Sequence, residues 1–74
     1  MNTEARRHSL NIVVNGQAVE APPGSLRSVL ETLGFDLRHA AVAVNETIVP
    51  RHDLDGYAPA DGDRVEVVAP MEGG

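Results

Sequence analysis

The first patterned segment of the chain alternates apolar and polar residues. Every second position from Leu10 to Val14 is apolar, and Asn15-Gly16 follows directly. Asn-Gly is the strongest short signal for a β-hairpin loop, because a type I′ turn needs positive φ at both positions. The apolar faces of the two strands coincide in this register, as a sheet with one buried face requires. The predicted pairs are Val14 with Gln17, Ile12 with Val19 and Leu10 with Ala21.

A helical period replaces the alternation after residues 22–24 (Pro-Pro-Gly), which end the second strand. Ser25 is a favourable N-cap. Gly34 suits the left-handed position just past a helix, with Phe35 available for the hydrophobic contact that often follows. Between these signals lies an apolar stripe at helical spacing, formed by Leu26, Val29, Leu30 and Leu33. The pattern predicts a helix of about nine residues, which needs a sheet to pack on because so short a helix is unstable alone.

The second half of the chain predicts a second strand pair. The apolar run 41–44 reads as a strand buried on at least one face, and Asn45-Glu46 reads as a turn. Residues 47–49 form the return strand, which Pro50 ends because proline cannot donate to a sheet ladder.

The remaining segment predicts a loop and a last strand. Residues 51–60 are expected to form a loop with one helical turn, in which Leu54 and Tyr57 close one end of the core. The turn signal at 61–63 (Asp-Gly-Asp) precedes the alternating strand 64–68. The order of elements predicts an α+β fold with one helix packed on a mixed sheet of four to five strands.

The composition excludes several classes of function. The chain has 74 residues, enough for one small domain, and it contains no cysteine. That absence excludes a disulfide, a thiolate zinc site and a cysteine nucleophile. Eleven acidic residues against six arginines, with no lysine, give a formal net charge of −5. Such a surface repels nucleic-acid phosphates and suits a partner with a basic docking face.

The sequence divides into a domain with two unpatterned ends. Residues 1–9 are expected to be a disordered lead-in, residues 10–70 the domain, and residues 71–74 a flexible tail. No run approaches the roughly 18 apolar residues of a membrane span, and the lead-in lacks the apolar run of a secretory signal. We therefore expect a cytoplasmic protein that makes no membrane contact.

The histidines and aspartates do not predict a metal site. His8, His39 and His52 are spaced irregularly, unlike the ligands of structural zinc. The aspartates between 53 and 63 lack the regular spacing and terminal glutamate of a calcium loop. We expect no bound metal, and the sequence offers no convincing pair of nucleophile and base.

Two internal motifs and the C-terminus resemble one family. The segment 44–51, Val-Asn-Glu-Thr-Ile-Val-Pro-Arg, is similar to the Asn-x-x-(Ile/Val)-Val-Pro-Arg segment of the thiamine-biosynthesis sulfur carriers (ThiS type). The segment 61–67 resembles their Asp-Gly-Asp turn and last strand, and Gly73-Gly74 resembles their carboxyl end. The resemblance covers about residues 10–74. It implies the β-grasp fold of the ThiS/MoaD ubiquitin-like family.

This resemblance implies that the chain is a carrier and not an enzyme. In such carriers a ThiF/MoeB-type adenylating enzyme activates the terminal glycine with Mg-ATP, and a persulfide donor then converts it to a thiocarboxylate. Gly74 would be the acceptor here, and a ThiG-type thiazole synthase would use its sulfur to form the thiazole of thiamine. The chain itself is expected to bind no cofactor.

Three residues of the tail are candidates for partner binding beside Gly74. Gly73 lacks a Cβ, so together with Gly74 it can thread a narrow channel. Residues 69–74 reach at most roughly 20 Å from the domain. Glu72 either steers the tail toward a basic channel or is simply solvated, and Met71 belongs to the same segment.

Two residues of the domain are further candidates for partner binding. The alternation of the last strand turns Val68 outward, where it either docks a partner together with Met71 and Pro70 or is an ordinary exposed residue. Arg51 either pairs with an acidic partner or bridges a local aspartate such as Asp53.

Three other functions remain open on the sequence alone. Pro70 resembles the proline-bearing tails of molybdopterin sulfur carriers, so molybdopterin or another thiolated product is an alternative acceptor. A ubiquitin-like conjugating modifier would join Gly74 to lysines of other proteins. A plain β-grasp interaction domain would not need Gly73-Gly74 at all.

Overall fold

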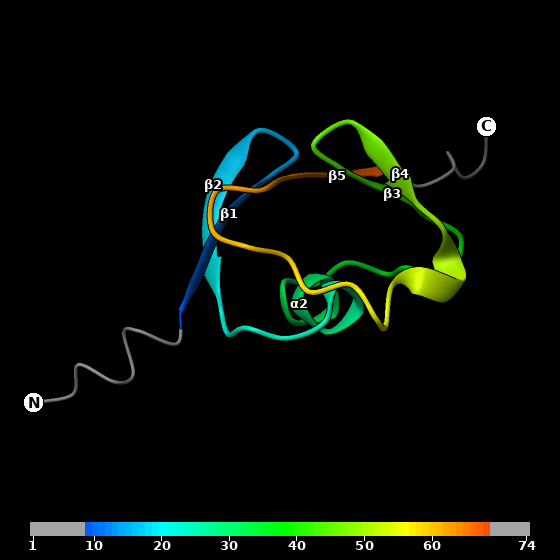
Figure 1. Cartoon of the computed structure of the whole chain (residues 1–74), viewed down its shortest axis with the longest axis horizontal. Coiled ribbons are helices and arrows are strands. Elements are labelled where there is room, and N and C mark those ends of the chain that lie inside the picture. Colours follow the sequence, from blue (N-terminus) through cyan, green and yellow to red (C-terminus); the bar gives the residue numbers. More distant parts are fainter. Residues whose placement is uncertain (1–8, 69–74) are drawn as a thin grey trace, which may run out of the picture.

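Residues 9–68 are described by a computed structural model, in which the strands form one five-stranded sheet of order β2-β1-β5-β3-β4. Helix α2 lies across one face of that sheet (Figure 1). Strands β1 and β5 are parallel, and the other neighbours are antiparallel. The predicted α+β fold is therefore confirmed. The elements are β1 (Leu10–Val14), β2 (Gln17–Ala21), α2 (Leu26–Thr32), β3 (Ala41–Val44), β4 (Thr47–Val49), the 3₁₀ helix η1 (Arg51–Asp53) and β5 (Arg64–Val68).

The predicted domain boundaries fall at the two ends of the chain. Apart from Ser9, the expected lead-in lies outside the described residues, as do residues 69–70 and the whole expected tail.

Both hairpins have the predicted turns. In the β1–β2 hairpin the predicted pairs are all found, and Asn15 and Gly16 have φ values of 52° and 83°. The β3–β4 hairpin repeats this geometry with φ values of 51° at Asn45 and 73° at Glu46. Two positive φ values in succession define the type I′ turn, whose twist matches that of the flanking strands.

Helix α2 is capped at both ends as the sequence predicts. Its N-cap Ser25 accepts a hydrogen bond at Oγ from the Ser28 N–H, over 3.1 Å. At the other end Gly34 has a φ of 100°, and the N–H groups of Gly34 and Phe35 donate to the carbonyls of Glu31 and Leu30, both over 3.0 Å. This is the Schellman arrangement.

The helix is shorter than the nine residues expected. It has seven, because Leu33 already takes the C-cap position with φ −80° and ψ −1°.

The loop after η1 is anchored on the N-terminus of α2. The first N–H groups of a helix lack partners within it, and here Leu26 and Arg27 donate theirs to the carbonyls of Tyr57 and Leu54, over 2.7 and 3.2 Å. The Leu54 side chain is only 1% exposed, and Tyr57 packs partly buried against the core. The expected closure of the core by these two residues is confirmed.

The core lies between α2 and the inner face of the sheet. Because side chains alternate along a strand, each strand contributes to the core every second residue, and the residues between them face outward. The buried core side chains are Leu10, Ile12, Val14, Ala21, Leu26, Val29, Leu30, Leu37, Val42, Val44, Val49, Leu54 and Val65.

Candidate functional site

The last strand of the described chain leads directly to the predicted acceptor. β5 is the central strand, and its final residue Val68 pairs with Ala41 at the start of β3. Val49 at the end of β4 pairs with Val42. Strands β4 and β5 therefore end at the same end of the sheet. Gly74, Gly73, Glu72 and Met71 follow β5 but lie outside the described residues, so their predicted roles stay predictions.

Two large apolar side chains stand exposed beside this exit. Val68 and Ile48 are each 64% exposed, the only large hydrophobic side chains of residues 9–68 that are this open to solvent. Ile48 pairs with Ala43 across β3–β4, in the row next to the Ala41–Val68 pair. We call these four residues, Ala41, Ala43, Ile48 and Val68, the outer patch.

The outward orientation of Val68 was predicted, whereas Ile48 was not recognised as exposed. The sequence contained a signal for this exposure, because the Asn45-Glu46 turn pairs Ile48 with Ala43. Both side chains then lie on the sheet face that points away from Val42 and Val44. Single exposed apolar residues are ordinary. A contiguous set on one sheet face is more typical of an interaction surface.

The described residues 9–68, which we call the body, are strongly acidic. Residues 9–68 hold nine of the eleven acidic residues but only four of the six arginines, so they carry the whole formal charge of −5. Three of these arginines are paired with acidic side chains of the same body. Such a surface complements a basic docking face.

Among the carboxyl groups of residues 9–68, that of Asp36 has the clearest pKa shift. Arg38 donates to it from the side chain and also from the backbone, with the shortest contact 2.8 Å between Nη2 and Oδ2. These hydrogen bonds lower the pKa of Asp36 from 3.8 to about 2. The same pairing raises the pKa of Arg38. This pair lies in the loop between α2 and β3.

Arg51 makes a local contact, but not the one expected. Its Nη1 donates to the carbonyl of Leu37 over 2.6 Å, whereas Oδ1 of Asp53 lies 3.7 Å from Nε2 of His52. The predicted Arg51–Asp53 bridge is therefore wrong. Residues two apart in a helical turn do not face each other, and the Leu37 carbonyl offers Arg51 a partner that ties the loop after α2 to η1. Binding of Arg51 to a partner stays a prediction.

The Asp-Gly-Asp turn has a structural role. Asp61 Oδ1 accepts the Asn11 N–H over 2.8 Å, and Asp63 Oδ2 accepts the Ala60 N–H over 2.9 Å. Gly62 adopts a φ of 88° between them, which favours glycine. The two carboxylates thus fix the turn that starts β5.

Both turn asparagines bind β5 with their side chains, which the sequence analysis did not predict. Asn15 Oδ1 accepts the Val67 N–H over 2.9 Å, and Asn15 Nδ2 lies 3.4 Å from the Val67 carbonyl oxygen to which it donates. Asn45 Oδ1 accepts the Arg64 N–H over 2.9 Å. In the sequence these residues indicate only a turn, because their β5 partners are far away along the chain.

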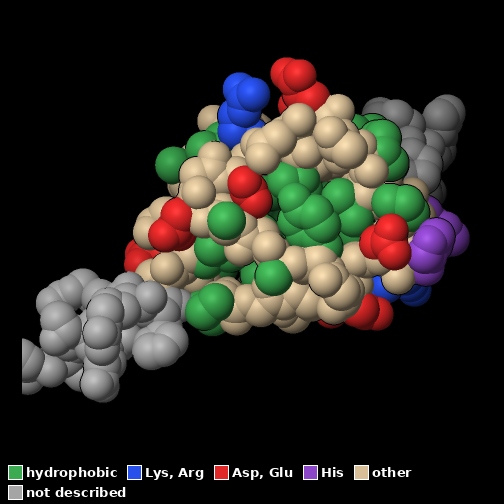
Figure 2. Space-filling model, in the orientation of Figure 1, with side chains coloured by type: hydrophobic (Ala, Val, Ile, Leu, Met, Phe, Trp, Pro, Cys, Tyr) green, Lys and Arg blue, Asp and Glu red, His purple; other side chains and the backbone are tan. Residues whose placement is uncertain are grey.

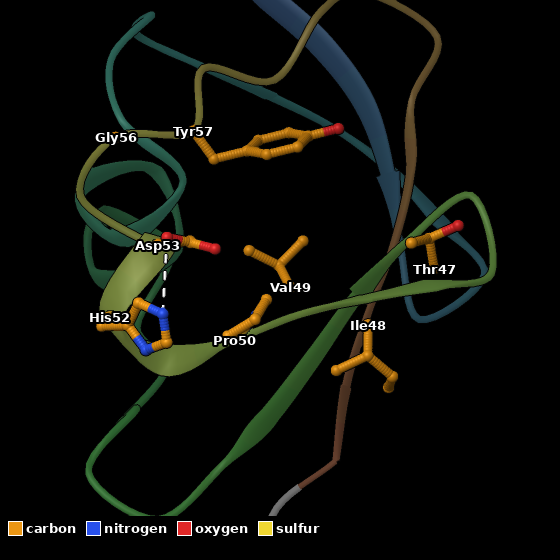
Figure 3. Close-up of a pocket in the computed structure, with 8 residues that line it drawn as sticks. All are labelled: Thr47, Ile48, Val49, Pro50, His52, Asp53, Gly56 and Tyr57. Atoms are coloured by element: carbon orange, nitrogen blue, oxygen red, sulfur yellow. Dashed lines mark ion pairs between the residues drawn. The ribbon is translucent and has the colours of Figure 1, made fainter.

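An open cavity of about 380 Å³ lies between β4 and the segment after it. Figure 3 shows the Tyr57 ring and the Val49 side chain facing this space, with His52 and Asp53 at its rim. Figure 2, in the orientation of Figure 1, shows hydrophobic side chains gathered between the sheet and the helix. The lining is Thr47, Ile48, Val49, Pro50, His52, Asp53, Gly56 and Tyr57.

The described residues 9–68 contain neither a metal-binding cluster nor a membrane-spanning helix. Within residues 9–68, no three histidine or acidic side chains are grouped so that they could hold a metal ion. His39 and His52 belong to that part, and His8 lies outside it. No helix in the same part is long and apolar enough to cross a membrane.

Comparison with known proteins identifies relatives of the whole body and tail. The model of the ThiS family matches residues 12–74. The sulfur carrier protein ThiS of Thermus thermophilus is 38% identical over 61 residues, which are 82% of this chain and 95% of that protein. The crystal structure of the thiamine biosynthesis protein ThiS from Geobacter metallireducens has a TM-score of 0.72 at 28% identity, covering 88% of this chain and all of that one.

Proposed function

The chain belongs to the ThiS family, and from this membership we propose that it carries sulfur for thiamine biosynthesis on the α-carboxylate of Gly74. The observation that carries the proposal is the extent of the family match, which runs from β1 through Gly74. The relative from Thermus thermophilus supports it, since that protein is a sulfur carrier.

Sulfur transfer to a carboxylate requires prior activation, because a carboxylate resists nucleophilic attack. An α-carboxyl has a pKa near 3.5, so Gly74 is ionised at neutral pH and can attack the α-phosphate of ATP. A ThiF/MoeB-type enzyme that holds Mg-ATP would form the acyl adenylate and release pyrophosphate. A persulfide sulfur then displaces AMP, and a thiol cleaves the resulting S–S bond to leave the thiocarboxylate. The sulfur comes from a separate persulfide donor, because these 74 residues contain no cysteine that could carry it.

The body would supply the affinity for these partners. The outer patch lies at the end of the sheet where β5 leads into the tail, and the surrounding body is acidic. A partner that covers Val68 and Ile48 with an apolar surface rimmed by basic residues can therefore bind the body while Gly74 enters its active site. The carrier has no turnover of its own, and the ThiG-type thiazole synthase that receives the sulfur would use the same face. We place this chemistry in the cytoplasm, where Mg-ATP is available.

Mass spectrometry of the intact chain tests the proposal directly. The chain is incubated with a ThiS-activating enzyme, Mg-ATP and a persulfide donor, and the expected product has one oxygen replaced by sulfur at Gly74. The matched control carries one residue appended after Gly74, which leaves the body intact and should accept no sulfur. An extended chain that accepted sulfur as readily as the original would contradict the proposal.

A further inference from the structure

The backbone N–H and carbonyl groups of Val67 point away from β3. In an antiparallel pair, facing residues alternate between those that exchange hydrogen bonds and those that do not. Asn45 donates its N–H to the Arg64 carbonyl over 2.7 Å, which makes Asn45–Arg64 a bonded pair. By alternation along the β3–β5 register, Ala43–Glu66 and Ala41–Val68 are bonded, and Val42–Val67 is not. The N–H and carbonyl of Val67 therefore face the β1 side.

Strand β1 ends before it can pair with Val67. The parallel ladder runs from the Val13 N–H to the Asp63 carbonyl, over 3.0 Å, and from the Asn15 N–H to the Val65 carbonyl, over 2.9 Å. The next step would join residue 17 to Val67, but the chain turns at Asn15-Gly16.

The Asn15 side chain takes the place of the missing strand. Its Oδ1 accepts the Val67 N–H over 2.9 Å, where the backbone carbonyl of residue 15 would lie in a continued ladder. Its Nδ2 donates to the Val67 carbonyl over 3.4 Å, where the N–H of residue 17 would lie. One amide side chain thus provides both partners of Val67 and extends the pairing of β5 on this side.

We propose that Asn15 is a positioning residue for sulfur transfer, whose amide fixes Val67 and with it the point and direction in which the chain leaves the body toward Gly74. The inference rests on the proposed function of Gly74. Val68 is both a member of the outer patch and the last residue of β5. Holding Val67 therefore fixes the docking surface and the root of the tail relative to each other, before any partner binds.

Asn45 provides a matched control within the same molecule. It also begins a type I′ turn, with a φ of 51° against 52° for Asn15, and it also accepts a β5 N–H at Oδ1 over 2.9 Å. Its partners are Arg64 at the start of β5 and Asp63, whose Oδ1 accepts from Asn45 Nδ2 over 3.1 Å. Both lie at the opposite end of the strand from Val68. Both asparagines bind β5, but only Asn15 binds the end of the strand from which the chain continues to Gly74.

The experiment compares Asn15→Gly with Asn45→Gly. Glycine adopts positive φ freely, so both turns are kept and only the side-chain hydrogen bonds are removed. The first readout is amide hydrogen exchange by NMR, which does not depend on any partner. Exchange at Val67 should accelerate about tenfold or more in Asn15→Gly and stay unchanged in Asn45→Gly, where Arg64 should accelerate instead.

The second readout is pyrophosphate release by the activating enzyme, which separates KM from kcat. In Asn15→Gly the KM for the carrier should rise at least about fivefold, because the freed residues must be ordered again on docking. The kcat should stay within about twofold of the original, and Asn45→Gly should match the original in both constants. Asn15→Asp keeps the acceptor for the Val67 N–H, so its KM should lie between those of the original chain and Asn15→Gly.

Equal kinetic constants in Asn15→Gly and Asn45→Gly would overturn the positioning role, even if Val67 exchange accelerates as expected. Unchanged Val67 exchange in Asn15→Gly would overturn its physical basis. Failure of the proposed function would be recognised separately, because the unaltered chain would then accept no sulfur at all.

Discussion

The inner face of the sheet carries Ile12, Val42 and Val65, each at most 2% exposed, whereas the outer face carries Ile48 and Val68, each 64% exposed. All five are apolar, so composition does not separate them. The inner residues stabilise the fold because α2 removes them from water. The outer residues gain little from folding, and their apolar character is better explained by recognition. In the proposed function, stability and docking fall on opposite faces of one sheet.

The largest effect is expected from a substitution in the core, on the inner face of the sheet, and concerns the free energy of unfolding. Leu30→Ala should lower the free energy of unfolding by about 2–5 kcal/mol, because Leu30 is fully buried and its removal leaves a cavity. Urea unfolding measures the change. The exposed neighbour Glu31→Ala should stay within about 0.5 kcal/mol. Sulfur acceptance should fall only with the folded fraction, and a fully folded but inactive Leu30→Ala would contradict the division.

The outer face should show the reverse behaviour. The double variant Ile48→Ser with Val68→Ser should change stability by less than about 1 kcal/mol but raise the KM for activation about tenfold, since docking loses apolar contact area. The control is Ala18→Ser, an exposed position on the same face in the edge strand β2. If the double variant and the control gave the same KM, the outer patch would not be the docking surface.

The backbone conformations of the turn residues Glu46 and Gly16 should affect stability alone. Glu46 has a φ of 73° although it is not glycine, and a left-handed conformation costs a side-chain-bearing residue roughly 1 kcal/mol. Glu46→Gly should therefore raise the free energy of unfolding by about 0.5–1 kcal/mol. The exposed ion pair it loses with Arg64, at 3.9 Å, contributes little. Gly16→Ala is the opposite control and should destabilise, because Gly16 has a φ of 83°. A Glu46→Gly chain less stable than the original would contradict this explanation.

The smallest effect is expected from Asp36 and depends on pH. Because hydrogen bonds from Arg38 lower its pKa from 3.8 to about 2 in the folded state, this carboxylate stabilises the fold above pH 3.8. The contribution should be lost as the pH falls from there through about 2. NMR titration of the Asp36 carboxyl should report the low value, and Arg38→Ala should move it up toward 3.8. An unchanged midpoint in that variant would exclude Arg38 as the cause.

The local features of the fold could be predicted from the sequence. The Asn15-Gly16 turn fixed a register, and Ser25 and Gly34 marked the ends of a helix, because each signal acts within a few residues of chain. The alternation in β5 correctly turned Val68 outward. The helix length was overestimated only because Leu33 continues the apolar stripe while already leaving helical geometry.

The contacts that cross the fold could not be predicted in this way. Arg51 binds the Leu37 carbonyl and Asn15 binds Val67, and neither partner is defined until the sheet has assembled. Ile48 was missed for a related reason, since an apolar residue in an apolar run does not reveal its face until the β3–β4 register is applied. The role of Gly74 as acceptor is proposed from family resemblance, because a terminal Gly-Gly marks a chemical group and carries no folding signal.

The common end of β4 and β5 has a consequence for how strongly a partner needs to bind. A protein seated on Ile48 and Val68 has the terminal carboxylate tethered within roughly 20 Å of its surface. Such tethering gives the reactive group an effective concentration in the millimolar range or above, even where free carrier is scarce. Weak and rapidly reversible docking is then sufficient, which suits a carrier that visits an activating enzyme and an acceptor in turn.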